Sequence, residues 1–333
     1  MQYALIDLAN TFFRARHIAS KNSTAWEKVG MALHLTMSSV NFVVRNFKID
    51  HVVFCLEGRS WRKDIYTPYK AHRKLAEAAM TEEEAEENKL FWETYDAFAE
   101  YLRERTNCSI LQYQKAEADD LIARFIHLHP GDHHYIISSD TDFVQLIAPN
   151  VQQYNGVTNQ LITLDGYFDD KGKSVLDKKT NEHKKLNDPR FILFEKCMRG
   201  DSGDNVFSAY PGVRTKGTKN KVGLIEAWED REKQGFNWNN LMLQKWLDHE
   251  GKEHKVKEDY ERNRKLIDLS AQPDDIKSEI DQSIRDKLRV AIIPQVGIHL
   301  MRFCAKYELN KINEQAEYYG RWLNSRYAGV LKE

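Results

Sequence analysis

"YIISSDTDF", residues 135–143, begins with a short apolar run, "YIIS", and continues with two aspartates, Asp140 and Asp142. The apolar residues predict a buried strand over "HYIIS" (134–138). Two charges directly after such a strand indicate either a solvated turn or a site for a divalent cation. The runs "YALIDL" (3–8) and "HVVFCL" (51–56) predict two further buried strands.

Helical patterns alternate with these strands. One covers about 25–46, and another covers 118–128, where apolar residues recur three or four positions apart. Strands that alternate with helices predict an α/β fold with a mostly parallel central sheet flanked by helices. In such sheets ligands bind at the carboxyl ends of the strands.

Length, charge and cysteines bound the possible class. A chain of 333 residues is long enough for about two domains. It carries 49 basic and 50 acidic residues, so a nucleic-acid binder would have to segregate its charges. No run approaches the ~20 apolar residues of a membrane span, and no basic segment precedes the apolar start. Four scattered cysteines without a C-x-x-C pair favour a reduced, cytoplasmic protein.

Two segments depart from the strand–helix alternation. Residues 61–105 are helix-prone and charged, and they lack Gly and Pro from Tyr69 onward. They predict helices that project from the sheet. From residue 191 on, helical patterns dominate. We therefore expect a core over 1–190 and a helical region over 191–333.

Acidic residues stand where the predicted strands end and where one helix begins. If the sheet is parallel, several of these converge on one edge. Two carboxylates ~4 Å apart repel by about 4 kcal/mol at an effective dielectric constant near 20. The candidates are Asp7, Glu57, Glu117, Asp119, Asp120, Asp140, Asp142 and, in "RGDSGDN", Asp201 and Asp204.

This clustering predicts a metal site. Oxygen ligands without converging His or Cys favour Mg²⁺, with Mn²⁺ as a substitute. Two such ions ~4 Å apart are the usual apparatus for attack on a phosphodiester. Each acid taken alone also fits a helix cap, a first-turn acid or a turn.

Basic residues form two further groups. Lys70 and Arg73 in "YKAHR" would share one face if this segment is helical, either as a solvated face or as cations over a scissile phosphate. Arg214, Lys216, Lys219 and Lys221 follow the turn at Pro211-Gly212. They form either a plain basic loop or a grip on DNA phosphates.

Together these motifs resemble the flap endonuclease/5′→3′ exonuclease family, most closely its phage RNase H branch. The resemblance rests on Asp7, "SWRKDIYTPYKAHR" (60–73), "AEADDLIA" (116–123), "ISSDTDFVQL" (137–146) and "RGDSGDNV" (199–206). These lie in the family's order and cover most of residues 1–230.

The resemblance implies a two-metal 5′-nuclease with a PIN-like core, in which eight of the nine acids, all but Glu57, match acidic positions of the family. A helical arch over about 61–105 would carry Lys70 and Arg73 as catalytic cations. A helix–turn–helix element over about 196–230 would grip duplex DNA. The expected substrates are 5′ ends or flaps of DNA and RNA–DNA duplexes, with RNA primers in phage replication. Single-strand-binding or other replication proteins are the expected partners, with no role for a membrane.

Two positions depart from the family pattern. After the second strand the family usually has Asp, whereas this chain has Glu57 in "FCLEGRSW". The grip motif reads "GVRTKGTK", with Gly212 and Gly217 five apart. Two alternatives stay open: a PIN-like ribonuclease, and a structure-specific DNA-binding protein without catalysis.

Overall fold

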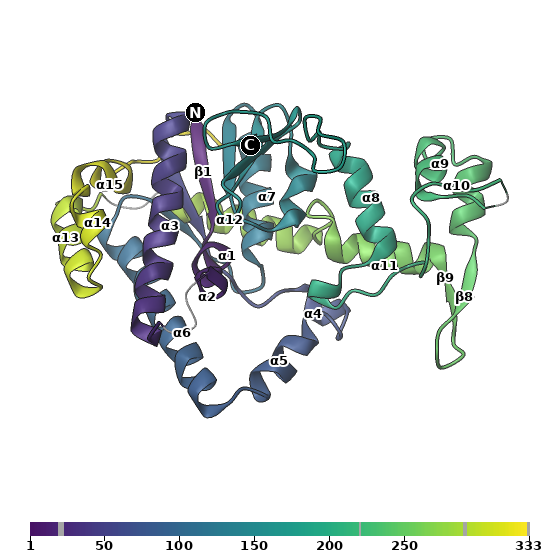
Figure 1. Cartoon of the computed structure of the whole chain (residues 1–333), viewed down its shortest axis with the longest axis horizontal. Helices are drawn as coiled ribbons and strands as arrows, with labels where there is room; N and C mark the ends of the chain where they lie inside the picture. Colours follow the sequence, from purple (N-terminus) through teal and green to yellow (C-terminus); the bar gives the residue numbers. More distant parts are fainter. Residues whose placement is uncertain (19–22, 220, 289–291, 332–333) are drawn as a thin grey trace. The chain divides into compact units, whose positions relative to one another are not determined.

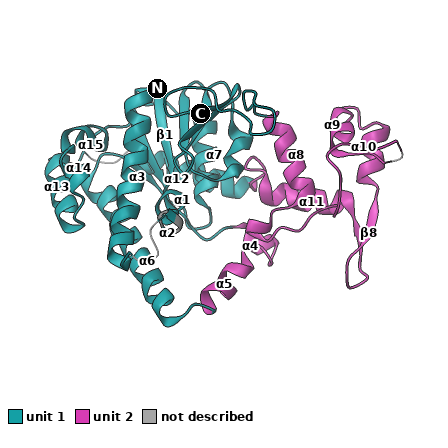
Figure 2. Cartoon of the chain, viewed as in Figure 1, with its two compact units in different colours: residues 1–60, 79–186, 274–333 teal, residues 61–78, 187–273 magenta. Residues whose placement is uncertain are grey.

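The computed structural model describes residues 1–18, 23–219, 221–288 and 292–331. Contacts divide the chain into two compact units, which Figure 2 colours separately. The sheet unit comprises residues 1–60, 79–186 and 274–333, and the helical unit comprises 61–78 and 187–273. These units are defined by which residues pack together and not by function. The functional division into 1–190 and 191–333 stays a prediction.

A seven-stranded sheet forms the centre of the sheet unit. Its order is β3-β2-β1-β4-β5-β6-β7. The first five strands in this order, β3, β2, β1, β4 and β5, pair in parallel. Strands β6 and β7 add an antiparallel extension at the β5 edge. The mostly parallel α/β sheet is confirmed. The bounds are β1 Gln2–Asp7, β2 His51–Cys55, β3 Ser109–Leu111, β4 His133–Ile137, β5 Val151–Asn155, β6 Gln160–Thr163 and β7 Gly166–Asp169.

Helices cover both faces of this sheet (Figure 1). One apolar core joins the sheet to α3, α6, α13 and α15. Helix α7 contacts β1 and β2, and α12 packs on α7 and β3. The bounds are α1 Leu8–Phe13, α2 Ala15–Ile18, α3 Ala25–Phe47, α6 Glu82–Arg105, α7 Ala118–Leu128, α12 Asp274–Lys287, α13 Val296–Lys306, α14 Asn310–Asn313 and α15 Ala316–Leu323.

Capping boxes start the two long helices. The Thr24 backbone N–H donates to Glu27 at 2.7 Å, and the Glu27 N–H donates back to the Thr24 hydroxyl at 3.2 Å. Thr81 and Glu84 repeat the arrangement at the start of α6. These reciprocal bonds satisfy N–H groups that a helix start otherwise leaves without partners. Residues 82–86, which are mostly glutamates, form the first turns of α6 and are exposed.

The helical unit has its own core. Phe194, Met198 and Leu224 are buried among its apolar side chains. The buried guanidinium of Arg62 donates to the Leu266 carbonyl at 2.8 Å. The elements are α4 Arg62–Ile65, α5 Ala71–Ala78, α8 Pro189–Arg199, the 3₁₀ turn η2 Ser202–Asp204, α9 Leu224–Glu229, α10 Phe236–Met242, a hairpin of β8 Lys245–Leu247 and β9 Glu253–Lys255, and α11 Val256–Ile267.

The last sixty residues return to the sheet unit. Leu300, Phe303 and Trp322 are buried in the same core as the strands. The rings of Phe303 and Tyr101 stack at 4.2 Å, which joins α13 to α6. The C-terminal helices are therefore part of the support for the sheet. No helix in the described ranges is long and apolar enough to cross a bilayer.

We expect Leu300→Ala to lower the free energy of unfolding by about 2–5 kcal/mol, because it opens a cavity in this core. Its neighbour supplies the control, since Met301 is 48% exposed whereas Leu300 is fully buried. Met301→Ala should change the stability by less than about 0.5 kcal/mol. Denaturant unfolding of both variants measures the difference. Equal effects would show that α13 does not contribute to the core.

Candidate functional site

Asp7 stands at the carboxyl end of the central strand. It lies opposite Cys55 in the parallel register, and its side chain is 6% exposed. One carboxylate oxygen, Oδ1, accepts from the Asn10 N–H at 3.1 Å, so Asp7 caps helix α1. Oδ2 accepts from the Ser138 hydroxyl at 3.1 Å. These two bonds fix the direction of the carboxylate at the edge of the sheet.

A close backbone approach brings Glu57 to the start of α7. The Gly58 N–H donates to the Ala116 carbonyl at 2.9 Å, and the Arg59 N–H donates to the Gln114 carbonyl at 2.7 Å. A Cβ on Gly58 would lie 2.2 Å from the Tyr113 carbonyl oxygen, so only glycine permits this approach. As a result, Glu57 Oε2 accepts from the Ala118 N–H at 3.4 Å.

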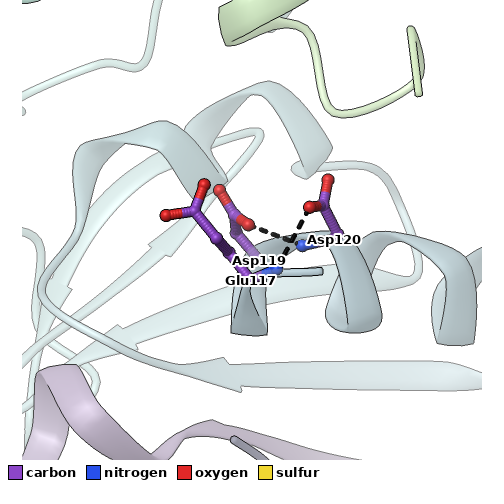
Figure 3. Close-up of side chains that lie close together, drawn as sticks. All are labelled: Glu117, Asp119 and Asp120. Carbon is purple, nitrogen blue, oxygen red and sulfur yellow. Dashed lines mark hydrogen bonds between the residues drawn. The ribbon is translucent and has the colours of Figure 1, made fainter. Parts of the chain in front are cut away.

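Three carboxylates crowd the first turn of α7. Oxygens of Glu117, Asp119 and Asp120 lie within 4.8 Å of one another. Figure 3 shows their side chains on one side of this turn, with Asp120 accepting from the Glu117 N–H at 3.2 Å. Glu117 is 4% exposed and Asp120 is fully buried. The acids thus serve as helix caps and still form a compact group of oxygen ligands.

Asp140 and Asp142 follow β4 at the same edge. The Asp142 N–H donates to Asp140 Oδ1 at 2.9 Å, and this bond caps the 3₁₀ helix η1, Thr141–Leu146. The Asp140 N–H in turn donates to Ser138 Oγ at 3.1 Å. Ser138 therefore links the aspartate that ends β1 to the turn after β4.

The negative charge of these acids raises the pKa values of two buried neighbours, Cys55 and Tyr95. Burial, followed by the charges of Asp7 and Glu57, raises the pKa of Cys55 well above its ordinary value. Burial, followed by the same two carboxylates, also raises the pKa of Tyr95. Asp7 and Glu57 therefore both lie close enough to Cys55 and Tyr95 to raise their pKa values.

The donor set fits a hard divalent cation. All seven predicted ligands in the sheet unit end or follow a strand or open a helix at the carboxyl edge, as the sequence predicts for ligands in a parallel sheet. Carboxylate oxygens suit Mg²⁺, Mn²⁺ or Ca²⁺ better than softer metals. The seven are Asp7, Glu57, Glu117, Asp119, Asp120, Asp140 and Asp142.

The helical unit holds the other two predicted ligands. Asp201 and Asp204 have oxygens within 4.8 Å of each other. Lys196 Nζ lies 2.8 Å from Asp201 Oδ2. Burial raises the pKa of Asp201, but the hydrogen bond and charge of Lys196 oppose it, and the pKa ends below its ordinary value.

The predicted cations meet Asp204 inside the helical unit. Lys70 Nζ lies 3.5 Å from Oδ2, and Arg73 donates to Oδ1 at 3.0 Å. The Tyr69 hydroxyl also donates to Oδ2, at 2.9 Å. Lys70 has a left-handed backbone with φ of 52°, and its N–H donates to the Asp204 carbonyl at 2.9 Å. This arrangement holds Lys70 more firmly than the exposed Arg73.

The basic loop of the helical unit, residues 211–223 with residue 220 outside the described part, closes on a carboxylate. Glu226 accepts from the Gly217 N–H at 2.9 Å and from the Gly223 N–H at 3.0 Å. A Cβ on Gly223 would lie 2.3 Å from the Gly217 nitrogen, so the two glycines permit the closure. The four predicted DNA-contacting cations are all exposed on this loop: Arg214, Lys216, Lys219 and Lys221.

Several partners of the site residues were not predicted from sequence. Ser138 binds Asp7, Tyr69 binds Asp204, and Lys196 binds Asp201. The position of Ser138 directly after a buried strand was a usable signal. Tyr69 carried no such signal, because its partner Asp204 is 135 positions away. Lys196 carried none either, because its partner Asp201 lies beyond the end of α8.

The comparisons agree with this arrangement. The profile described as 5′-3′ exonuclease, N-terminal resolvase-like domain, matches residues 2–178. The 5′-3′ exonuclease of Mycoplasmopsis pulmonis is 25% identical over 232 residues, which cover 68% of each chain. The flap endonuclease of Escherichia phage T5 is 26% identical over 226 residues, covering 66% of this chain and 68% of that protein. DNA polymerase I of Rhizobium leguminosarum is 29% identical over 181 residues, but these span 15% of its length.

Solved structures share the fold. The T5 5′-exonuclease with bound divalent metal ions gives a TM-score of 0.60 at 20% identity, covering 86% of this chain and 99% of that one. The T5 flap endonuclease in complex with DNA and metal ions gives 0.59, covering 86% and 98%. These neighbours bind divalent metals, and this chain has acidic clusters at its sheet edge. From the sheet, the acids and the family match over residues 2–178, we conclude that this chain belongs to the 5′-3′ exonuclease family.

Proposed function

We propose that the chain is a divalent-metal-dependent 5′-nuclease that hydrolyses phosphodiesters at 5′ ends or flaps of DNA and RNA–DNA duplexes. The observation that carries this proposal is the convergence of acids from β1, β2, β4 and α7 on one sheet edge. The family match favours this activity over a PIN-like ribonuclease or a DNA-binding protein without catalysis. The T5 relative is a flap endonuclease and the T5 structure holds DNA, and both support the same class of substrate.

The acids of the sheet edge would hold Mg²⁺, with Mn²⁺ as a substitute. Glu117, Asp119 and Asp120 form the compact part of this set, and Asp7 stands on the neighbouring strand. Bound divalent ions supply the positive charge that activates a water and stabilises the leaving oxygen. The contribution of the chain is to hold the carboxylates in fixed directions through their capping bonds. Asp201 and Asp204 remain predicted members of the ligand set.

Lys70 and Arg73 are the proposed cations at the scissile phosphate. In the structure both pair with Asp204, and Lys70 is the less exposed side chain of the two, 12% against 59%. Preorganised charge that stabilises developing negative charge acts on the chemical step. The Asp204 pairs would serve to hold these cations before a substrate phosphate arrives.

The exposed cations on the loop closed by Glu226 are the proposed grip on duplex DNA. Exposed lysines and backbone N–H groups bind phosphates without reading sequence. This segregation of charge explains how a chain with net charge −1 could bind DNA. Removal of RNA primers in phage replication, the RNase H branch and contacts with single-strand-binding or other replication proteins remain the finer parts of the proposal.

We expect cleavage of 5′-labelled flap, nicked and RNA–DNA substrates to stop in excess chelator and to return with Mg²⁺ or Mn²⁺. Loss of a residue that only hydrogen-bonds to a metal ligand costs up to about 100-fold in activity. Asp142 is proposed to be a ligand itself, so Asp142→Asn should slow cleavage by more than about 100-fold. Duplex affinity should stay near that of the parent. Glu83→Gln is the matched control, because Glu83 is an exposed acid in the first turn of α6. Full cleavage in chelator would contradict the proposal.

We expect Lys70→Met to slow single-turnover cleavage by roughly 10²–10³-fold, because it removes one preorganised charge. Methionine keeps the aliphatic stem and meets the same left-handed backbone, so the charge is what changes. Lys74→Met is the control, because Lys74 is exposed on α5. Rates at saturating enzyme on a 5′-flap substrate measure the effect. A Lys70→Met rate within threefold of the parent would leave the pair with Asp204 as a structural contact.

A further inference from the structure

A cavity of about 820 Å³ lies in the sheet unit, between the end of α3 and the antiparallel extension of the sheet. Its volume is in the range of sites that bind ligands or peptide side chains, roughly 300–1,000 Å³. None of the residues proposed above to bind metal or DNA lines it. The cavity therefore needs an explanation of its own.

An apolar row across three strands forms the floor of this cavity. Tyr154 of β5 pairs with Leu161 of β6, and Leu161 pairs with Phe168 of β7. Residues directly opposite on neighbouring strands point to the same face, so the three side chains form a continuous row. Leu161 and Phe168 are half-buried, and both line the cavity.

Helix α3 forms the wall. Phe42 stacks on Tyr154 with ring centroids 4.8 Å apart, and Phe47 stacks on Tyr135 at 4.5 Å. Both phenylalanines line the cavity and are half-buried. Ring faces of this kind attract ammonium and guanidinium groups as well as apolar side chains.

The rim is acidic. Asp165, Asp169 and Asp170 line the cavity together with a single cation, Lys171. Asp165 and Asp170 are exposed, and Asp169 Oδ1 accepts from the Lys171 N–H at 2.9 Å. The last turn of α3 carries Arg45 and is followed by Lys48, and these cations oppose the partial negative charge of the helix C-terminus, so the negative charge of the rim comes from the three aspartates. This rim repels nucleic-acid phosphates and attracts cations.

We propose that this groove docks a segment of a partner protein in which lysines or arginines flank a bulky apolar side chain. The apolar floor takes the anchor, and the acidic rim takes the flanking cations. A small polycation would satisfy the rim and leave the floor without a partner. DNA would meet like charge at the rim, so the groove is separate from the proposed substrate grip, and the inference does not rest on the proposed nuclease activity.

Fluorescent seven-residue peptides test this assignment on the full chain by anisotropy. The first probe has a Leu-Phe-Leu core flanked on each side by two lysines. The second carries glutamates as flanks, and the third carries a serine core between lysines. We expect the first probe to bind at least about tenfold more tightly than the other two, because each lacks one of the two interactions.

Variants of the groove locate the binding. Asp165→Asn combined with Asp170→Asn should weaken the first probe by about tenfold, and Leu161→Ala should do so as well. Glu182→Gln is the charge control, because Glu182 is exposed in the segment that follows β7 and does not line the cavity. The circular dichroism spectrum and the unfolding midpoint of every variant should match those of the parent, which shows that they fold without reference to any activity.

Three outcomes would overturn the proposal. One is the absence of binding of the first probe at millimolar concentration. Another is equal affinity for the glutamate-flanked or serine-core probes, which would indicate adhesion through one interaction alone. The third is unchanged affinity in both the double aspartate variant and Leu161→Ala, which would place the probe elsewhere on the chain.

Discussion

Repulsion among carboxylates at the carboxyl edge of the sheet is the constraint on which the rest of this structure depends. Two such groups ~4 Å apart cost about 4 kcal/mol at an effective dielectric constant near 20, and the start of α7 alone gathers three. The chain tolerates this crowding because backbone N–H groups hold several of the acids as caps. Asp7 caps α1, Asp120 closes the start of α7 and Asp140 caps the turn after β4. A cation bound there would offset the remaining repulsion.

The sequence predicted the parts of the fold that have strong periodicity. Strands near 3–8, 51–56 and 134–138 and the helix over 118–128 are present within one or two residues of their predicted bounds. Strand β3 was missed because three residues, Ser109–Leu111, show no alternation. The return of α13 and α15 to the sheet was missed because their apolar faces specify burial and not the partner that buries them.

The same limit applies to the site. The acids could be predicted because each stands where a strand ends or a helix begins. Gly58 could not, since its need for glycine comes from the carbonyl of Tyr113, which lies far along the chain. The pairing of Lys70 with Asp204 was likewise invisible, because it joins residues 134 positions apart through tertiary contact. Charge thus segregates into an acidic sheet edge, a basic loop and an acidic groove beside α3, while the total stays near zero.

Binding of Mn²⁺ measured by electron paramagnetic resonance tests the central claim most directly, because the signal of the free ion disappears when the ion binds. We expect the parent to bind Mn²⁺ in the absence of DNA, and Asp119→Asn and Asp120→Asn each to weaken this binding by more than about tenfold. Each substitution keeps the shape of the side chain and removes one charge from the cluster. Circular dichroism of both variants checks that the fold persists. Equal Mn²⁺ affinity in the parent and in two folded variants would show that these acids are helix caps and not metal ligands.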